Sequence, residues 1–342
     1  MNRIIQKLQE GQHLSTNQAK DVLTDILLGK YSDKQVEEFL IVFESKSKSN
    51  SYHWQELLGF IQAMKSCCIS INTTIKKPIM DVCGTGGSGK NRFNISTATA
   101  FVLSAAGIYV AKHGNYGSKR PNGSFNFLEE MNIPFQFEVD TINTILKGSK
   151  CCFLFARHFH PGMRHVVSAR KKIEKQTVFN FLGPLVNPIT LTYQLIGLSS
   201  NQNIEVLIDT VKQLPTKRVL FCIGGDGRDE VSLEGTTRFL HVEQDGVKEF
   251  EFNFSKEIES IDANYKCGDS NTNALTFINI FIEENWEHPI IKHICINAAA
   301  AMLCYANVGS LVEGYEKSIT LFKSDEVTKS INRYKEVAAT IK

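Results

Sequence analysis

The chain has 342 residues, which is enough to bury a large core in one big domain and a smaller one. Its 38 Lys and Arg residues nearly balance its 36 Asp and Glu residues, which argues against a broad nucleic-acid or membrane footprint. Residues 1–15 are amphipathic and lack a signal-peptide core, and no segment approaches the ~18 uninterrupted apolar residues of a membrane span. The nine cysteines show no Cys-x-x-Cys spacing, and several lie within apolar runs, as reduced and buried thiols do. These features predict a soluble, cytoplasmic protein with no nucleic-acid or membrane partner.

Residues 1 to about 70 show only helical patterns. Ser15-x-x-Gln18 and Ser32-x-x-Gln35 match the capping box, and Gly29 lies where a helix would end. The last of these helices carries an apolar stripe at helical spacing, formed by Trp54, Leu57, Leu58, Ile61 and Met64. We expect this stripe to be core or subunit interface rather than a ligand site, and residues 46–51 to be a solvated connection.

From residue 78 onward, strand-like and helix-like runs alternate. The strand-like runs are at 79–83, 108–112, 151–156 and 218–223, and the helix-like runs are at 96–106, 124–131, 161–174 and 202–213. A further strand is predicted at 177–180, a hairpin turn at 244–247, and closing helices that include 297–303 and about 310–323. This alternation predicts an α/β fold with a mainly parallel central sheet flanked by helices. We therefore expect a small all-helical domain at 1–72, joined by helices near 161–190, and a large α/β domain at 73–342.

Residues 81–99 (DVCGTGGSGKNRFNISTAT) place four glycines between a strand-like and a helix-like run. Glycines before a helix N-terminus let backbone N–H groups approach an anion, which suits phosphate binding. The segment spells both a dinucleotide-type GxGxxG and a P-loop-type GxxxxGK. However, Asn91 stands where a P-loop needs Ser or Thr, and the next strand ends in basic residues rather than an acidic one. A tight strand-to-helix turn without a ligand remains an equal alternative from this motif alone.

Chemically useful side chains follow several of the predicted strands, where ligands of α/β sheets collect. Lys112 ends the second strand and can neutralise a phosphate as a point charge. Asp229 and Glu230 follow a later strand, and adjacent carboxylates on a glycine-rich loop suit magnesium. The acidic pair could instead lie on a solvated loop, and Arg170 could be a surface residue of a helix. For the histidines at 158–165, a place in a pocket wall is favoured over a zinc site. One shared phosphate site explains these positions together.

The motifs, in matching order, resemble those of the anthranilate phosphoribosyltransferases over nearly the whole chain. They include DVCGTGG, NIST, AKHGN, FHPGMRHV, TVFNFLGPLVNP, GDGRDEVSLEGTT and the terminal NAAAAM. The resemblance implies a helical domain and an α/β domain, with a homodimer formed through the helical parts. It also implies transfer of the phosphoribosyl group from phosphoribosyl pyrophosphate (PRPP) to the amine of anthranilate, in tryptophan biosynthesis. Two magnesium ions would help pyrophosphate to leave. No side chain would act as a nucleophile.

The resemblance also implies roles for individual residues. PRPP contacts are implied for Gly84, Gly87, Ser88, Arg92, Asn94, Ile95, Ser96, Thr97, Lys112, His113, Gly114, Asn115 and Ser124. Anthranilate contacts are implied for Gly84, Asn115, His160, Arg170, Gly183 and Pro184. Magnesium contacts are implied for Ser96, Asp229 and Glu230. Arg170 suits the acceptor's carboxylate because a guanidinium can bind it with two parallel hydrogen bonds.

The sequence departs from the family pattern at three places. Ser88 replaces the usual acidic residue after GTGG, residues 116–122 carry a different loop chemistry, and Arg157-His158 replaces a usual Pro-Asn. Two alternatives therefore stay open beside the anthranilate reaction. One is a related enzyme with another aromatic acceptor, and the other is a protein that binds PRPP without turnover.

Overall fold

The computed structural model describes residues 1–46, 52–86, 93–117, 121–173, 176–259, 265 and 267–341. The chain divides into two units. Unit 1 comprises Met1–Ser70, Ala156–Pro188 and Asn201–Leu214, and unit 2 comprises Ile71–Phe155, Ile189–Ser200 and Pro215–Lys342. None of the helices in the described ranges combines the length and apolar character that a bilayer span demands.

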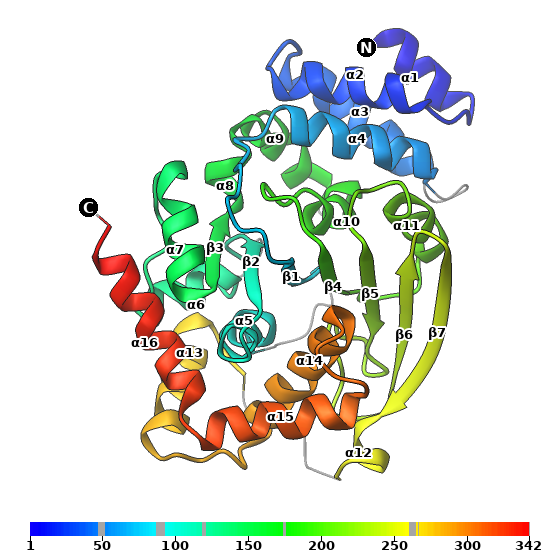
Figure 1. Ribbon diagram of the computed structural model, residues 1–342. Coiled ribbons are helices and arrows are strands. Elements are labelled where there is room, and N and C mark those ends of the chain that lie inside the picture. The colour runs from blue at the N-terminus through cyan, green and yellow to red at the C-terminus, as the bar shows by residue number, and fades with distance from the viewer. Residues whose placement is uncertain are drawn as a thin grey trace. The chain divides into compact units, whose positions relative to one another are not determined.

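The regular elements in the described part of unit 1 are all helices (Figure 1). They are α1 (Asn2–Gln9), α2 (Thr16–Leu27), α3 (Asp33–Lys46), α4 (Trp54–Ser66), α8 (Ala156–Phe159), the 3-10 turn η2 (Pro161–Met163), α9 (Arg164–Ile173), α10 (Val178–Leu185) and α11 (Ile204–Val211). Helix α2 packs on α4, and α3 packs on α9, so segments far apart in the sequence share one core. The grouping places α11 with these helices because it packs on α4, although the residues fall within the range 73–342 predicted for the α/β domain.

The predicted helix signals of the first 70 residues are confirmed. Both capping boxes form, with Ser15 N donating to Gln18 Oε1 at 3.1 Å and Ser32 N donating to Gln35 Oε1 at 3.0 Å. In the apolar stripe of α4, the side chains of Leu57, Ile61 and Met64 are buried, and those of Trp54 and Leu58 are half-buried. The solvated connection predicted at 46–51 lies outside the described residues, apart from the end of α3.

Unit 2 contains a seven-stranded sheet with the strand order β3-β2-β1-β4-β5-β6-β7. The strands are β1 (Ile79–Gly84), β2 (Tyr109–Gly114), β3 (Cys151–Phe155), β4 (Tyr193–Gly197), β5 (Arg218–Ile223), β6 (Thr236–Glu243) and β7 (Gly246–Asn253). Strands β1 to β5 pair in parallel, and β6 and β7 add an antiparallel hairpin. The predicted mainly parallel sheet and the predicted hairpin are confirmed, and so is the fold class of a helical part plus an α/β part.

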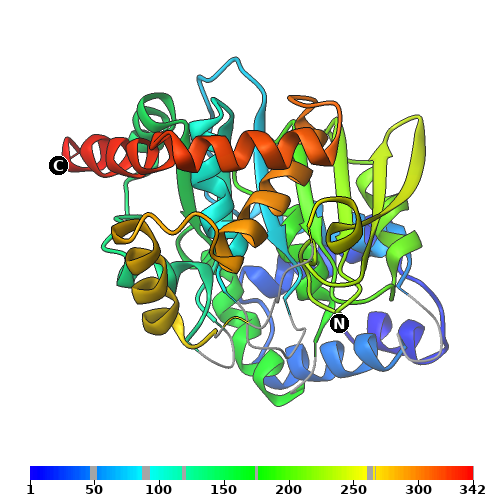
Figure 2. The same cartoon turned by 90° about the horizontal axis from the view of Figure 1, so that it is seen from below.

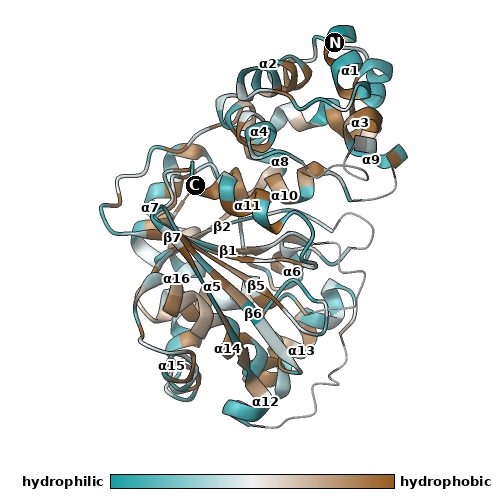
Figure 3. Ribbon diagram, turned by 90° about the vertical axis from the view of Figure 1, so that its right-hand side faces the viewer, coloured by the Kyte–Doolittle hydropathy of each residue, from teal (hydrophilic) through white to brown (hydrophobic). Residues whose placement is uncertain are grey.

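The helices of unit 2 are α5 (Ile95–Ala105), α6 (Ser124–Glu130), the 3-10 turn η1 (Val139–Thr141), α7 (Ile142–Ser149), α12 (Phe254–Glu257), α13 (Ser270–Ile282), α14 (Pro289–Tyr305), α15 (Leu311–Lys323) and α16 (Glu326–Ala339). Helix α14 contacts β4 and β5 and packs between α5 and α15, and its residues 298–302 are fully buried. Helices α15 and α16 follow one another along one side of this unit (Figure 2). The parallel strands β1 to β5 are mostly buried, and brown residues run along the sheet in Figure 3, because helices cover this part of the sheet. The edge strand β7 is mostly exposed.

The strand predicted at 177–180 is wrong. These residues begin α10, where Asn180 Oδ1 accepts a hydrogen bond from Thr177 N at 3.1 Å, as a helix cap does. The buried residues Phe179, Leu182 and Leu185 follow the helical spacing. A short apolar run is ambiguous between strand and helix, and here the cap and the longer spacing decide for helix. Conversely, strand β4 was not predicted.

Candidate active site

The central feature of unit 2 is the point where the strand order reverses. The chain runs outward from β1 through β2 to β3, and then continues on the other side of β1 with β4 and β5. The adjacent strands β1 and β4 both end in glycine, and Gly84 and Gly197 are partners in the strand register. Ligands of open α/β sheets bind at such a reversal, beyond the carboxyl ends of the strands.

The loop after β5 brings the acidic pair to this point. Asp229 and Glu230 are 7% and 9% exposed, and Asp229 Oδ2 accepts a hydrogen bond from Gly86 N at 2.7 Å. A Cβ atom on Gly84 would lie 2.2 Å from Asp229 Oδ2, and a Cβ atom on Gly197 would lie 1.8 Å from the Asp229 carbonyl oxygen. Only glycine at these two strand ends therefore leaves room for the acidic loop. The predicted proximity of the glycine segment and the acidic pair is real.

The donor set of this loop fits magnesium. Two adjacent, nearly buried carboxylates supply hard oxygen ligands, and magnesium is commonly held by one or two carboxylates together with substrate phosphates and water. Among the described residues, no group of three or more His, Cys, Asp or Glu side chains could hold a metal ion.

The N-terminus of α5 follows the glycine segment. Ser96 is half-buried there, whereas Thr97 is 1% exposed and its Oγ1 has no hydrogen-bond partner in the described structure. A buried hydroxyl without a partner is costly, so this atom marks a position where a polar ligand would compensate. Ile95 lies in the core, which leaves only its backbone for a phosphate contact. Phosphates bind such helix N-termini because free N–H groups and the helix dipole attract anions.

Asn94 has a structural role in this structure. Its Nδ2 donates to the carbonyl oxygens of Asn122 and Gly123 at 3.4 and 3.3 Å, and its Oδ1 accepts from Asn273 Nδ2 at 3.1 Å. These bonds connect the start of α5 with the loop before α6 and with α13. No motif in the sequence points to α13, so the role of Asn273 becomes visible only in the fold.

The residues at the end of β2 contact β1 and the start of α6. Lys112 is 1% exposed, and its Nζ donates to the carbonyl oxygen of Val82 on β1 at 2.7 Å. His113 is buried, and its backbone N donates to Asp81 Oδ1 at 3.3 Å. A Cβ on Gly114 would meet Ser124 Oγ at 3.2 Å, so these two predicted residues are neighbours, whereas Asn115 is exposed. Gly87, Ser88 and Arg92 lie outside the described residues.

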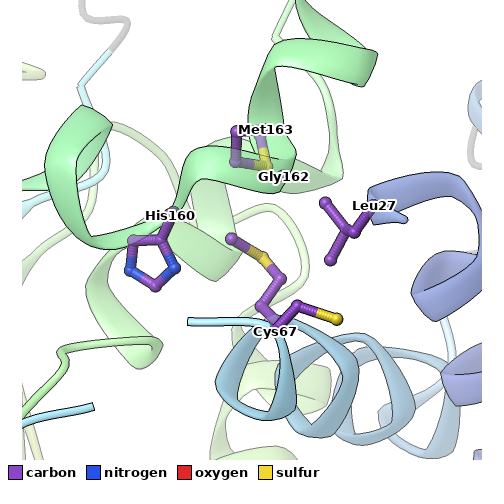
Figure 4. A pocket seen from close by; sticks show the side chains of 6 residues that line it. Leu27, Cys67, His160, Gly162 and Met163 are labelled. Carbon is purple, nitrogen blue, oxygen red and sulfur yellow. The ribbon is translucent and has the colours of Figure 1, made fainter. Parts of the chain in front are cut away.

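Unit 1 contains the other predicted residues, among them His160 in a small pocket. The pocket is lined by Leu27, Met64, Cys67, His160, Gly162 and Met163 (Figure 4). His160 is 5% exposed, and burial lowers the pKa of its imidazole to about 4. His160 is therefore neutral at physiological pH, so it can donate or accept one hydrogen bond at each nitrogen but carries no charge.

Arg170 on α9 and the residues of α10 are also close to one another within unit 1. The Arg170 guanidinium lies 5.3 Å from the centre of the Phe179 ring, and burial lowers its pKa, opposed by the nearby Glu44 carboxylate. Glu44 accepts hydrogen bonds from Tyr52 Oη at 2.6 Å and from Val178 N, the first N–H of α10, at 2.8 Å. Pro184 is buried in α10, and Gly183 has open space where a side chain would be. A half-buried guanidinium on an aromatic face is suited to bind a carboxylate.

Comparisons with known proteins identify the family. Residues 2–68 match the family model described as the helical bundle domain of a glycosyl transferase family, and residues 76–325 match its a/b domain. An anthranilate phosphoribosyltransferase of Oceanobacillus iheyensis is 30% identical over 332 residues, covering 97% of this chain and 96% of that protein. The enzyme of the same name from Methanosarcina barkeri is 32% identical over 338 residues, covering 98% of this chain and 90% of that protein.

Solved structures give the same answer for the fold. The crystal structure of anthranilate phosphoribosyltransferase from Thermus thermophilus superposes with a TM-score of 0.87 at 26% identity, covering 98% of both chains. The Saccharomyces cerevisiae enzyme in complex with PRPP and Mg has a TM-score of 0.88 at 24% identity, covering 99% of this chain and 98% of that one. From the family models and these relatives together, the chain belongs to the anthranilate phosphoribosyltransferase family of glycosyl transferase enzymes.

Proposed function

We propose that this protein transfers the 5-phosphoribosyl group of PRPP to the amine of anthranilate, which gives N-(5-phosphoribosyl)anthranilate and pyrophosphate in tryptophan biosynthesis. The observation that carries the proposal is the acidic pair at the strand reversal, where Asp229 contacts the glycine segment through Gly86 N at 2.7 Å. In the proposal, the carboxylates would hold magnesium next to a diphosphate that binds along the glycine segment and the N-terminus of α5. The family membership and the Saccharomyces cerevisiae neighbour with PRPP and Mg support the same assignment.

In the proposed reaction, the protein's own groups bind and orient the two substrates. The diphosphate and ribose of PRPP would lie along the glycine segment and the start of α5, where Ser96 and Thr97 supply hydroxyls. Lys112 is buried at the end of β2 next to β1, where a lysine side chain can attract a phosphate as a point charge. Asp229, Glu230 and Ser96 would hold magnesium, as two ions, and bound magnesium would neutralise the leaving pyrophosphate. We assign no nucleophile, since the attacking group is the amine of the acceptor.

The acceptor would bind through its carboxylate to Arg170. The guanidinium lies over the ring of Phe179, and the negative charge of the nearby Glu44 carboxylate favours its charged form. Gly183, one helical turn after Phe179 on α10, has open space where a side chain would be, and neutral His160 can form a hydrogen bond without adding charge. We further propose that the enzyme is a homodimer through its helical part. Three large apolar side chains of unit 1, Leu28, Ile41 and Val167, are 59%, 48% and 45% exposed and support such an interface.

We place the reaction in the cytoplasm, which is supported by the cysteines. All nine are free thiols, and burial raises the pKa of Cys151, Cys152, Cys222, Cys295 and Cys304, which keeps them protonated and unreactive.

A panel assay tests the proposal. The purified protein with PRPP and magnesium should consume anthranilate, measured by the loss of its fluorescence, alongside a set of other aromatic amines and aromatic carboxylates. Turnover of anthranilate with the highest kcat/KM supports the proposal. Preference for another amine would assign a different acceptor, and PRPP binding without turnover of any acceptor would contradict the enzymatic function.

A further inference from the structure

Helix α14 carries Asn297, the first residue of the alanine-rich motif, to which no role has been assigned so far. Its side chain is 4% exposed and forms hydrogen bonds with Val231, which lies in the acidic loop. Oδ1 accepts a hydrogen bond from Val231 N at 2.9 Å, and Nδ2 donates to the Val231 carbonyl oxygen at 3.1 Å. Nδ2 also donates to the His293 carbonyl oxygen at 2.9 Å, which fixes the amide on its own helix. Asn297 therefore holds both backbone groups of the residue that follows Glu230.

His293, one helical turn earlier, adds a second anchor. It is 1% exposed, and its Nε2 contacts the Val231 carbonyl oxygen at 2.7 Å. Because that oxygen can only accept, Nε2 carries the proton and Nδ1 accepts a hydrogen bond from Tyr265 Oη. Tyr265 Oη in turn accepts a hydrogen bond from Arg228 Nη1 at 3.3 Å. One continuous network thus connects α14 with the loop on both sides of the acidic pair.

The two anchored positions, Arg228 and Val231, leave only Asp229 and Glu230 between them. We propose that Asn297 and His293 are positioning residues, which hold the backbone at Val231 and so fix the position of the acidic pair before a magnesium diphosphate binds. Asp229 contacts the glycine segment through Gly86 N, and Glu230 Oε1 lies 3.8 Å from His293 Nε2 and 3.9 Å from Arg228 Nη1. The inference rests on the proposed function, since it assumes that the acidic pair binds the metal. It goes beyond that function because it assigns the geometry of the pair to α14.

The physical reason is preorganisation. A loop that carries two adjacent carboxylates repels itself electrostatically, and its preferred conformation without anchors would separate them. Helix α14 is a rigid support, because nearly all of its residues from Ile290 to Cys304 are buried. Partners that orient metal ligands without touching the metal typically contribute about 10–100-fold to metal affinity. We expect a loss of that size when either anchor is removed.

The test uses full-length variants and manganese as a paramagnetic probe for the metal site. Asn297→Leu removes all three hydrogen bonds at similar side-chain size. His293→Leu removes the bonds to Val231 and Tyr265, together with the 3.8 Å contact between Nε2 and Glu230 Oε1. His293→Gln keeps an N–H group close to the position of Nε2. Cys295→Ala, also fully buried on α14, serves as the matched control. Binding of Mn²⁺ in the presence of PRPP is measured by electron paramagnetic resonance, with thermal unfolding of each variant and the KM values of both substrates.

We expect about 10–100-fold weaker Mn²⁺ binding for Asn297→Leu and His293→Leu, affinity closer to wild type for His293→Gln, and no change for Cys295→Ala. The KM for PRPP should rise while the KM for the acceptor stays constant. Equal Mn²⁺ affinity in wild type and all folded variants would overturn the inference and leave the proposed function standing. Absence of Mn²⁺ and PRPP binding by the wild type would overturn the proposed function itself. If Asn297→Leu does not fold, the His293 pair decides, and equal affinity of His293→Leu and His293→Gln overturns the inference.

Discussion

Replacing Gly197 with alanine should disable the acidic loop without removing any of its side chains. The new Cβ would lie 1.8 Å from the carbonyl oxygen and 2.3 Å from the carbonyl carbon of Asp229. Both atoms belong to the backbone, so no side-chain rotation relieves the overlap. An ordinary contact needs 3.4 Å or more, and the loop must therefore retreat by roughly 1.6 Å, the difference between 3.4 and 1.8 Å. Misplacing a site by about 1 Å can cost ~10²-fold in rate, so we expect kcat/KM to fall at least that far.

The assay follows anthranilate fluorescence at saturating magnesium, with PRPP varied. The loss should appear mainly in kcat and in the KM for PRPP, and a moderate destabilisation of about 1–3 kcal/mol should accompany it because the site becomes overpacked. Gly246→Ala is the matched control, since it makes the same chemical change in the same unit at a position with no atom within 4 Å. A Gly197→Ala protein with wild-type kcat/KM would refute the argument that glycine is required here for the acidic loop.

Three further outcomes are expected. Replacing Asp229 and Glu230 together by alanine should abolish turnover and weaken PRPP binding in magnesium while the far-ultraviolet circular dichroism stays unchanged; unaltered kinetics would remove the metal assignment. Arg170→Ala should raise the KM for anthranilate at least tenfold and leave the KM for PRPP nearly constant, since a charged hydrogen-bonded pair contributes about 1.5–3 kcal/mol; equal effects on both constants would contradict a carboxylate-binding role. The pKa of His160 is about 4 in the folded protein and 6.5 in an unfolded chain, so the unfolded chain takes up a proton at a higher pH than the folded one. The free energy of unfolding should therefore decrease as the pH falls from 6.5 toward 4, by on the order of 3 kcal/mol. His160→Gln should flatten this pH dependence in urea unfolding between pH 7 and 4.5, and an unchanged slope would show that other groups cause it.

The sequence was sufficient to predict the fold class, because both kinds of element leave a periodic signal. Four strands and the hairpin were predicted to within one or two residues, and the capping boxes of the first helices were read from Ser and Gln spacing alone. The error at 177–180 arose because a four-residue run with the two apolar residues Val178 and Phe179 fits a strand and a helix equally well. Strand β4 was missed for a related reason. Its short run Tyr193–Gly197 is surrounded by other apolar residues, and its pairing with β1 is a long-range property.

The candidate site was predictable where chemistry is carried by residue type. Two adjacent carboxylates, a strand-end lysine and a glycine segment can be recognised in one dimension, and the structure brings the acidic pair to the glycine segment. What the sequence could not show is the support behind these groups. Asn297 and Asn273 are ordinary asparagines in helices until the fold places them against Val231 and Asn94. Likewise, the need for glycine at position 197 follows only from the fold, which places the Asp229 backbone next to it.

The division of the chain into units has a consequence for biosynthesis on the ribosome. Unit 1 is assembled from three stretches, and the chain passes from one unit to the other after Ser70, Phe155, Pro188, Ser200 and Leu214. The four helices that emerge first therefore lack α9, which packs on α2 and α3, until more than a hundred further residues have been translated. During this time part of the apolar surface of the nascent helical bundle stays exposed to solvent. Chaperones bind such exposed surfaces, and proteases cleave chains in this state. We therefore expect that residues 1–70 expressed alone will not form a stable domain, and that limited proteolysis will not release one.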